Sequence, residues 1–147
     1  MNLRFGLDLL AVASVEQSLA EQGARYLTRI YTPGEIADST RPSGVDARRL
    51  AERFAAKEAT LKVLPASDEG LDFRAIELRM DAESERMWID VHGRAAELAA
   101  VAGIRRLAVS VTSDRRLAAA VVVAEVDDAD DAGEGVDLVA QPRARTR

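Results

Sequence analysis

Cysteine is absent from all 147 residues, so the chain can form no disulfide, present no thiolate nucleophile and build no cysteine-based metal site. Long apolar runs are absent too, since none approaches the roughly 20 residues of a membrane-spanning helix. The opening MNLRFGLDLL has neither the basic segment nor the long apolar segment of a signal peptide. We therefore expect a cytoplasmic protein with no membrane segment.

An excess of positive charge is also missing, because the formal net charge is −5 at pH 7. This balance argues against a nucleic-acid-binding protein. Six acidic residues and three arginines, with few apolar residues, fall in residues 127–147. We expect one folded domain at residues 1–126, followed by a disordered tail that is first acidic and then arginine-rich.

Residues 2–10 alternate between apolar and polar side chains, which predicts a half-buried strand. Its polar side presents Asp8, close to Gly6. The apolar side, which we expect to be buried, consists of Leu3, Phe5, Leu7 and Leu9.

Two capping boxes predict helix starts, one at Ser14 with Gln17 and one at Thr32 with Glu35. Gly23 is expected to interrupt the first helix. Residues 39–45 predict a loop, and Asp46 is the expected cap of a longer helix.

The stretch from Arg48 to Leu64 contains no glycine or proline and predicts one long helix. Its expected buried stripe consists of Leu50, Phe54, Leu61 and Leu64. Lys57 falls inside this stripe, and Glu58 and Lys62 lie at its edge. A charge on a buried stripe costs stability unless it is paired or bound to something, so this helix is where we look for function.

The second half of the chain predicts further strands. Residues 76–80 and 87–91 alternate and predict an antiparallel pair, and a short helix is expected at 94–102. Residues 107–111 predict another strand, and the apolar run 117–126 predicts a central one. The expected class is α+β, with an antiparallel sheet packed against one long helix and shorter helices.

Asp8 and Glu58 lie on separate predicted elements, and Lys62 follows Glu58 by one helical turn. Two such carboxylates suit Mg²⁺, which completes its coordination with water and substrate phosphate, while lysine offers a mobile charge to phosphate oxygens. The alternatives stay open: Glu58 and Lys62 could form a surface ion pair at i, i+4, and Asp8 could cap a turn.

Three motifs resemble the holo-acyl-carrier-protein synthases, the small 4′-phosphopantetheinyl transferases. They are Gly6-Leu7-Asp8, the RFAAKEA block at 53–59 followed by Lys62, and Ser110-Val111-Thr112. The resemblance covers roughly residues 3–126. It implies the fold of this family and transfer of 4′-phosphopantetheine from coenzyme A to a serine of an acyl carrier protein, with release of 3′,5′-ADP. It also implies a homotrimer with active sites between subunits.

The resemblance further implies roles for individual residues. Asp8 and Glu58 would hold Mg²⁺, and Glu58 and Lys62 would be catalytic, with Glu58 the nearest candidate base. The residues that would contact coenzyme A are Arg53, Lys57, Lys62, Thr112 and Ser113. Arg25 and Arg29 would dock the acidic carrier protein, although a solvated helix face is the other interpretation of these two arginines.

The chain departs from the family pattern at several positions. Ala11 and Ser14 stand where the family commonly has an acidic and a basic residue, and Ser113 stands where it often has histidine. Pro65 and Ala66 replace a glycine-rich turn. His92 matches no family site, and we expect a structural role for it. A paralogue that only binds a carrier protein or coenzyme A, and a scaffold that interacts through its acidic tail, remain alternatives.

Overall fold

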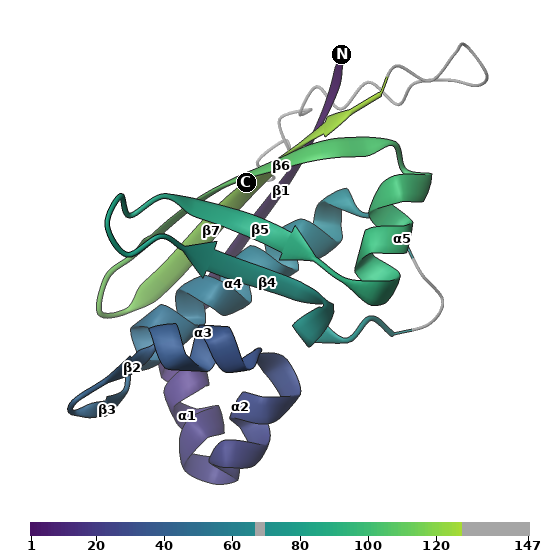
Figure 1. The fold of residues 1–147 in the computed structure, drawn as a ribbon. Helices are drawn as coiled ribbons and strands as arrows, with labels where there is room; N and C mark the ends of the chain where they lie inside the picture. Colours follow the sequence, from purple (N-terminus) through teal and green to yellow (C-terminus); the bar gives the residue numbers. More distant parts are fainter. Residues whose placement is uncertain (67–69, 128–147) are drawn as a thin grey trace, which may run out of the picture.

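The computed structural model describes residues 1–66 and 70–127, and it places one long helix between two antiparallel sheets (Figure 1). The larger sheet has the order β1-β7-β6 and the smaller one pairs β4 with β5. The strands are β1 (Asn2–Ala11), β4 (Ile76–Met80), β5 (Met87–Val91), β6 (Ile104–Ser113) and β7 (Leu117–Val126). The predicted α+β class is confirmed. The tail predicted to be disordered comprises residues 127–147, of which residues 128–147 lie outside the described residues.

In chain order, the helices are α1 (Val12–Gln22), α2 (Ala24–Ile30), α3 (Pro33–Asp38), the long α4 (Ala47–Val63), the 3₁₀ turn η1 (Phe73–Ala75) and α5 (Gly93–Val101). The loop predicted at 39–45 contains a small hairpin of β2 (Thr40–Arg41) and β3 (Gly44–Val45). Among the described residues, no helix is long and apolar enough to span a membrane.

The central position predicted for β7 is confirmed. This strand pairs with β1 on one side and with β6 on the other, both antiparallel. Its alternate residues are buried beneath α4: Ala118, Ala120, Val122, Ala124 and Val126. Three of these five side chains are alanines, so the helix can lie close to the sheet.

The prediction that the apolar side of β1 is buried is wrong. Leu3, Phe5, Leu7 and Leu9 keep 42%, 59%, 65% and 60% of their surface exposed. The opposite side, with Gly6 and Asp8, faces α4. The reason is steric, because a Cβ at Gly6 would lie 1.9 Å from the carbonyl oxygen of Ala59.

The long helix begins as predicted, since the Asp46 side chain accepts hydrogen bonds from the backbone N–H groups of Arg48 and Arg49. The predicted buried stripe is only partly right. Leu50 and Leu64 are buried, but Phe54 and Leu61 are half-buried. The fully buried positions include small residues instead, namely Ala51, Ala55, Ala56 and Ala59, because α4 packs on two sides.

The two predicted capping boxes have different outcomes. Thr32 and Glu35 form the expected box at the start of α3. Ser14 does not cap a helix: α1 begins at Val12, and the Ser14 hydroxyl donates to the Ala11 carbonyl from inside the first turn. The break at Gly23, which has φ of +55°, is confirmed.

Candidate functional site

The candidate site lies at the seam where β1 crosses α4. Gly6 makes this seam possible, since any side chain there would meet the Ala59 carbonyl and approach Lys62 Cβ to 3.3 Å. Asp8 is two residues further along the same side of β1, so it also faces α4. The close approach therefore brings Asp8 beside the part of α4 that carries Glu58 and Lys62.

Lys62 bridges the seam. Its ammonium nitrogen lies 3.0 Å from Asp8 Oδ1 and donates to the Leu7 carbonyl at 2.5 Å. The Asp8 side chain is 18% exposed and that of Lys62 is 49% exposed, so both stay within reach of a ligand. Lys62 pairs with Asp8 and not with Glu58, so the alternative of a surface ion pair between Glu58 and Lys62 does not form.

Glu58 is half-buried and makes no hydrogen bond or ion pair within the described part of the chain. Burial raises the pKa of this carboxyl above its usual value, and the negative charge of Asp8 raises it further, while Lys62 lowers it. Glu58 precedes Lys62 by one helical turn and Lys62 contacts Asp8, so the two carboxylates lie at the same seam. That site contains two negative groups and one ammonium.

This donor set fits Mg²⁺. Within the described ranges, no cluster of three or more His, Cys, Asp or Glu side chains could hold a metal by itself. Magnesium needs no such cluster, because it usually binds one or two carboxylates and completes its shell with water and substrate phosphate. Asp8 and Glu58 supply two carboxylates of this kind.

Lys57 lies away from the seam. It is fully buried, with its nitrogen 2.7 Å from Glu35 Oε2, and it donates to the carbonyls of Phe73 (2.9 Å) and Ile76. Burial lowers the pKa of its ammonium, and the charge of Glu35 offsets part of that effect. In this geometry Lys57 joins α4 to α3 and β4 and has no surface to offer to coenzyme A.

Sequence reasoning missed Glu35 as the partner of Lys57. Glu35 is fully buried, and it also accepts hydrogen bonds from the backbone N–H groups of Thr32 (3.0 Å) and Leu78 (2.9 Å). The signal was present, because a lysine on a buried stripe requires a counter-ion. The capping box with Thr32 already gives Glu35 a role, so the sequence alone does not single it out as the counter-ion of Lys57.

Arg53 is also buried, with 3% exposure. Its guanidinium donates to the Arg49 carbonyl at 3.1 Å and lies 3.7 Å from Asp38, while its Nε has no partner in the described structure. Burial lowers its pKa, and the charge of Asp38 opposes the shift. Arg53 precedes Glu58 by more than one turn of α4. Its contacts within the described residues are with Arg49 and Asp38, so it does not reach the seam.

Thr112 and Ser113 end β6. Thr112 is in register with Ala119, which pairs with Leu9, so its side chain lies on the outer face of the sheet and not on the face of Asp8. Ser113 donates to Glu52 Oε1 at 2.5 Å. A single copy of the chain therefore does not bring Thr112 to Asp8.

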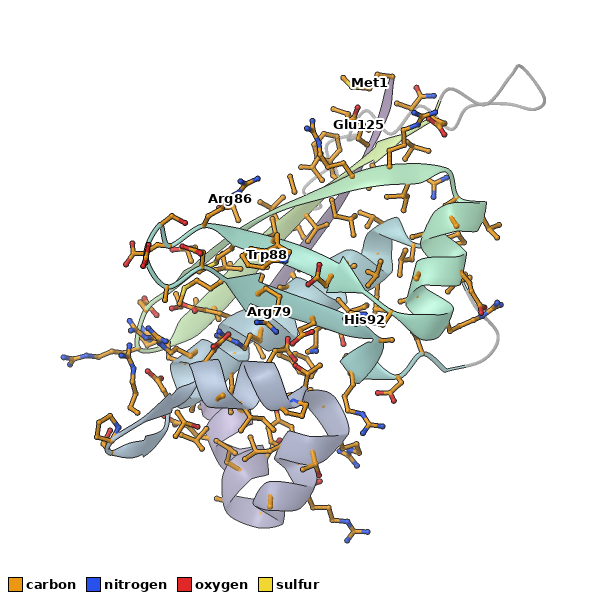
Figure 2. All side chains as sticks on the ribbon, viewed as in Figure 1. Met1, Arg79, Arg86, Trp88, His92 and Glu125 are labelled. Carbon is orange, nitrogen blue, oxygen red and sulfur yellow. The ribbon has the colours of Figure 1, made fainter. Side chains whose placement is uncertain are left out.

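Arg25 and Arg29 are exposed on α2, where both remain accessible to a partner. His92 precedes α5, with Nε2 3.4 Å from Glu77 Oε2. Arg79 also contacts Glu77, at 3.1 Å, and Figure 2 shows Arg79 and His92 on the outward side of the β4–β5 pair.

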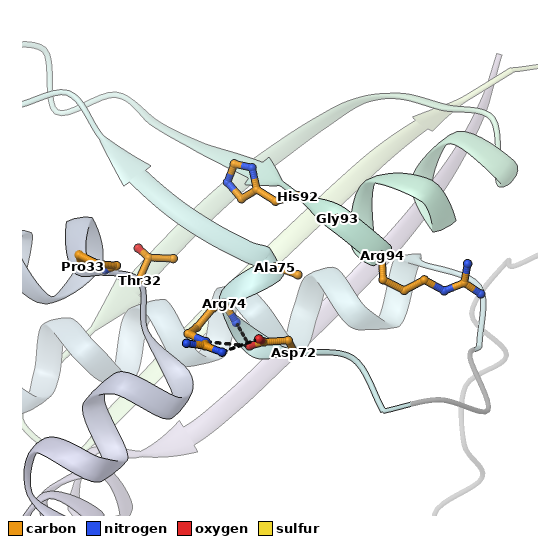
Figure 3. A pocket seen from close by; sticks show the side chains of 8 residues that line it. All are labelled: Thr32, Pro33, Asp72, Arg74, Ala75, His92, Gly93 and Arg94. Carbon is orange, nitrogen blue, oxygen red and sulfur yellow. Dashed lines mark hydrogen bonds and ion pairs between the residues drawn. The ribbon is translucent and has the colours of Figure 1, made fainter.

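A pocket of about 480 Å³ lies beside His92 (Figure 3). Its lining residues are Thr32, Pro33, Asp72, Arg74, Ala75, His92, Gly93 and Arg94. Arg74 pairs with Asp72 at 2.8 Å and Arg94 pairs with Glu97 at 3.0 Å. The pocket contains none of the predicted site residues.

Known proteins resemble this chain over most of its length. Residues 4–121 match the family model of the 4′-phosphopantetheinyl transferase superfamily. The holo-acyl-carrier-protein synthase of Paramagnetospirillum magneticum is 37% identical over 134 residues, which cover 88% of this chain and 100% of the relative. The synthase of Halothermothrix orenii is 34% identical over 120 residues, covering 82% and 94%.

Solved structures agree with these matches. The Helicobacter pylori holo-acyl-carrier-protein synthase in complex with coenzyme A has a TM-score of 0.70 at 26% identity, over 83% of this chain and 100% of that one. The Chronobacterium ammoniagenes synthase–coenzyme A complex has a TM-score of 0.74 at 25% identity, over 87% and 100%. The matched residues 4–121 include the whole seam between β1 and α4.

Proposed function

Because the chain belongs to the 4′-phosphopantetheinyl transferase superfamily, we propose that it transfers 4′-phosphopantetheine from coenzyme A to a serine of an acyl carrier protein, with Mg²⁺ as cofactor and 3′,5′-ADP as second product. The observation that carries the proposal is the cluster of Asp8, Glu58 and Lys62 at the seam. It joins two carboxylates from different elements to one accessible ammonium, which is a suitable set for a metal-bound pyrophosphate.

Asp8 and Glu58 are the residues that would hold the metal. When bound, Mg²⁺ would neutralise the pyrophosphate of coenzyme A and stabilise the charge that develops as the anhydride breaks. Lys62 has three N–H donors, of which two are used by Asp8 and the Leu7 carbonyl. The third remains for a phosphate oxygen.

In the transfer itself, the serine oxygen of the carrier attacks the phosphorus next to the pantetheine arm. The bond from that phosphorus to the bridging oxygen breaks, and 3′,5′-ADP leaves with the electron pair. Lys62 offsets the negative charge on the leaving phosphate. The protein works by positioning and charge neutralisation, as is usual in phosphoryl transfer.

The serine must also lose a proton. Glu58 is the nearest candidate base, acting directly or through a water molecule. Its pKa is raised by burial and by Asp8, and a raised pKa makes a carboxylate a stronger base at neutral pH. The positive charge of Lys62 opposes this rise in the pKa of Glu58.

We propose a homotrimer with active sites between subunits. Supporting this, the outer face of the large sheet is apolar and uncovered along β1, where Phe5, Leu7 and Leu9 are each at least 59% exposed. An exposed apolar face of this kind marks an interaction surface. Thr112 lies on the same face, so a neighbouring copy could present it to coenzyme A at the seam. Thr112 would then serve a site that its own copy does not complete. Ser113 lies on the opposite side of the sheet and would have to leave Glu52 to join it.

Arg25 and Arg29 are the proposed contacts for the acidic carrier protein. Both are exposed on α2, and complementary charge speeds the encounter of two proteins. A coenzyme A contact by Arg53 or Lys57, which the family resemblance implied, would require these buried side chains to leave their present partners.

The proposal is tested by incubating the protein with coenzyme A, Mg²⁺ and several apo-carrier proteins, then measuring the intact mass of each carrier. One carrier should gain a phosphopantetheine group. The gain should disappear with Asp8→Ala or with a metal chelator and return when Mg²⁺ is restored. Binding of coenzyme A without modification of any carrier would instead identify a protein that only binds.

A further inference from the structure

Arg4 lies on the same side of β1 as Gly6 and Asp8, because alternate residues of a strand share a side. The contact of Gly6 with Ala59 shows that this side faces α4. Arg4 Nη1 donates to the carbonyl of Val63 at 3.4 Å. Its guanidinium therefore lies at the C-terminal end of α4, beside Val63, the residue that follows Lys62.

The charge of Arg4 has no counter-ion in the part of the chain that the structure describes. Six other arginines there do pair with a carboxylate: Arg53, Arg74, Arg79, Arg94, Arg105 and Arg106. A guanidinium has five N–H donors in a planar fork. Arg4 uses one of them in a long hydrogen bond and is only half-buried, so most of its donors remain free.

The end of α4 is a poor place for an anion unless a cation is added. The last carbonyls of a helix have no partner within it and carry partial negative charge, which repels phosphate. The turn that follows, Leu64-Pro65-Ala66, has no glycine, and Pro65 has no N–H to donate. Among the described side chains of the seam, Lys62 then supplies the positive charge for a bound phosphate while it is also paired with Asp8.

We infer that Arg4 is a second cation for the pyrophosphate of coenzyme A, placed at the C-terminal end of α4 beside Lys62. Its positive charge offsets the partial negative charge of the Val63 carbonyl. Its free N–H groups are offered to the same phosphate oxygens that Lys62 approaches from the Asp8 side. The inference rests on the proposed function and adds a specific residue to its substrate site.

Calorimetric titration with coenzyme A tests this role in Arg4→Ala, Arg4→Lys and the control Arg94→Ala, which removes an exposed arginine on α5. We expect Arg4→Ala to weaken binding about tenfold, as for the loss of one charge-assisted hydrogen bond. Arg4→Lys should recover part of the loss, and Arg94→Ala should match the wild type. Dephospho-coenzyme A, which keeps the pyrophosphate, should show the same loss.

Thermal unfolding of each variant shows whether it is folded at the titration temperature. If Arg4→Ala is not folded there, the comparison is made with Arg4→Lys. Equal affinity of the wild type and both Arg4 variants would overturn the inference while leaving carrier modification intact. A loss with coenzyme A but not with dephospho-coenzyme A would overturn it too, by assigning Arg4 to the 3′-phosphate. A wild type that binds no coenzyme A would refute the proposed function as well.

Discussion

Gly6 is the residue on which the seam depends. A methyl group at this position would lie 1.9 Å from the Ala59 carbonyl, so α4 would have to move away from β1. We expect Gly6→Ala to destabilise the protein by about 1–3 kcal/mol, as overpacking does, and to lose most transfer activity because Asp8 moves away from Glu58.

Gly70→Ala is the matched control for Gly6→Ala, because nothing lies within 4 Å of its added Cβ. Urea unfolding and initial transfer rates would be measured for both variants. If Gly6→Ala behaved like Gly70→Ala in both measurements, the close approach of β1 to α4 would not be needed.

Lys57 allows a second test at this scale. Lys57→Met leaves Glu35 buried without its counter-ion, which should cost about 3–5 kcal/mol of unfolding free energy. The double variant Glu35→Gln, Lys57→Met removes both charges and should regain part of that loss. Denaturant unfolding of Lys57→Met, Glu35→Gln and the double variant measures the coupling energy between the two side chains.

The family resemblance implied a different role for Lys57, in contact with coenzyme A. Under that role Lys57→Met would keep its stability and raise the KM for coenzyme A. The fully buried nitrogen, with three protein partners, favours the structural role. Unchanged stability of Lys57→Met would contradict that structural role.

Among the elements, α3 is tied to the β4–β5 pair through Glu77. Its Oε1 accepts from Thr32 Oγ1 at 2.7 Å and from Arg79 Nη1 at 3.1 Å. Burial by itself would raise the pKa of Glu77, but the hydrogen bonds from Thr32, Arg79 and His92 outweigh it, and the net pKa is lowered. A lowered folded pKa stabilises the protein above the unfolded value of 4.5, and this stabilisation is lost as the pH falls.

We therefore predict that Glu77→Gln makes the decline of unfolding free energy on acidification shallower than in the wild type. The decline would be followed by denaturant titration from neutral pH to below 4.5. Glu97→Gln, on the exposed side of α5, is the control and should leave the slope unchanged. Equal slopes for all three proteins would show that Glu77 does not contribute to acid sensitivity.

Local signals in the sequence predicted the elements well where a few neighbouring residues decide the structure. Thr32 with Glu35 and Asp46 capped the helices expected of them, since a cap depends only on the adjacent turn. The orientation of β1 could not be predicted in this way. Its alternation gives the period, but which side faces α4 is decided by the contact of Gly6 with Ala59, more than 50 residues away.

The candidate site shows the same division. Motif resemblance selected Asp8, Glu58 and Lys62, and the structure brings these three residues together. It could not reveal that Lys57, adjacent to Glu58, points to Glu35 on another element, nor that Arg4 reaches the end of α4. Both depend on packing between segments that are distant in sequence.

At the scale of the whole molecule, the exposed apolar side of β1 should hold the subunits together. We expect Leu7→Glu to dissociate the proposed trimer, because it places a charge on that face, and to reduce transfer if the site lies between subunits. Light scattering after size-exclusion chromatography measures the mass. Val101→Glu, on an 83% exposed residue of α5, is the control and should leave the assembly unchanged. A wild type that is already monomeric would contradict the proposed assembly.

The central claim is that Asp8, Glu58 and Lys62 form the site at which phosphopantetheine is transferred. The most direct measurement is the initial rate of carrier modification by Glu58→Gln, followed by intact mass and compared with the wild type and with Glu97→Gln. We predict a loss of about 100-fold or more for Glu58→Gln, as for removal of a general base, with an unchanged melting temperature and no loss for Glu97→Gln. A folded Glu58→Gln protein that modifies its carrier at the wild-type rate would contradict this claim.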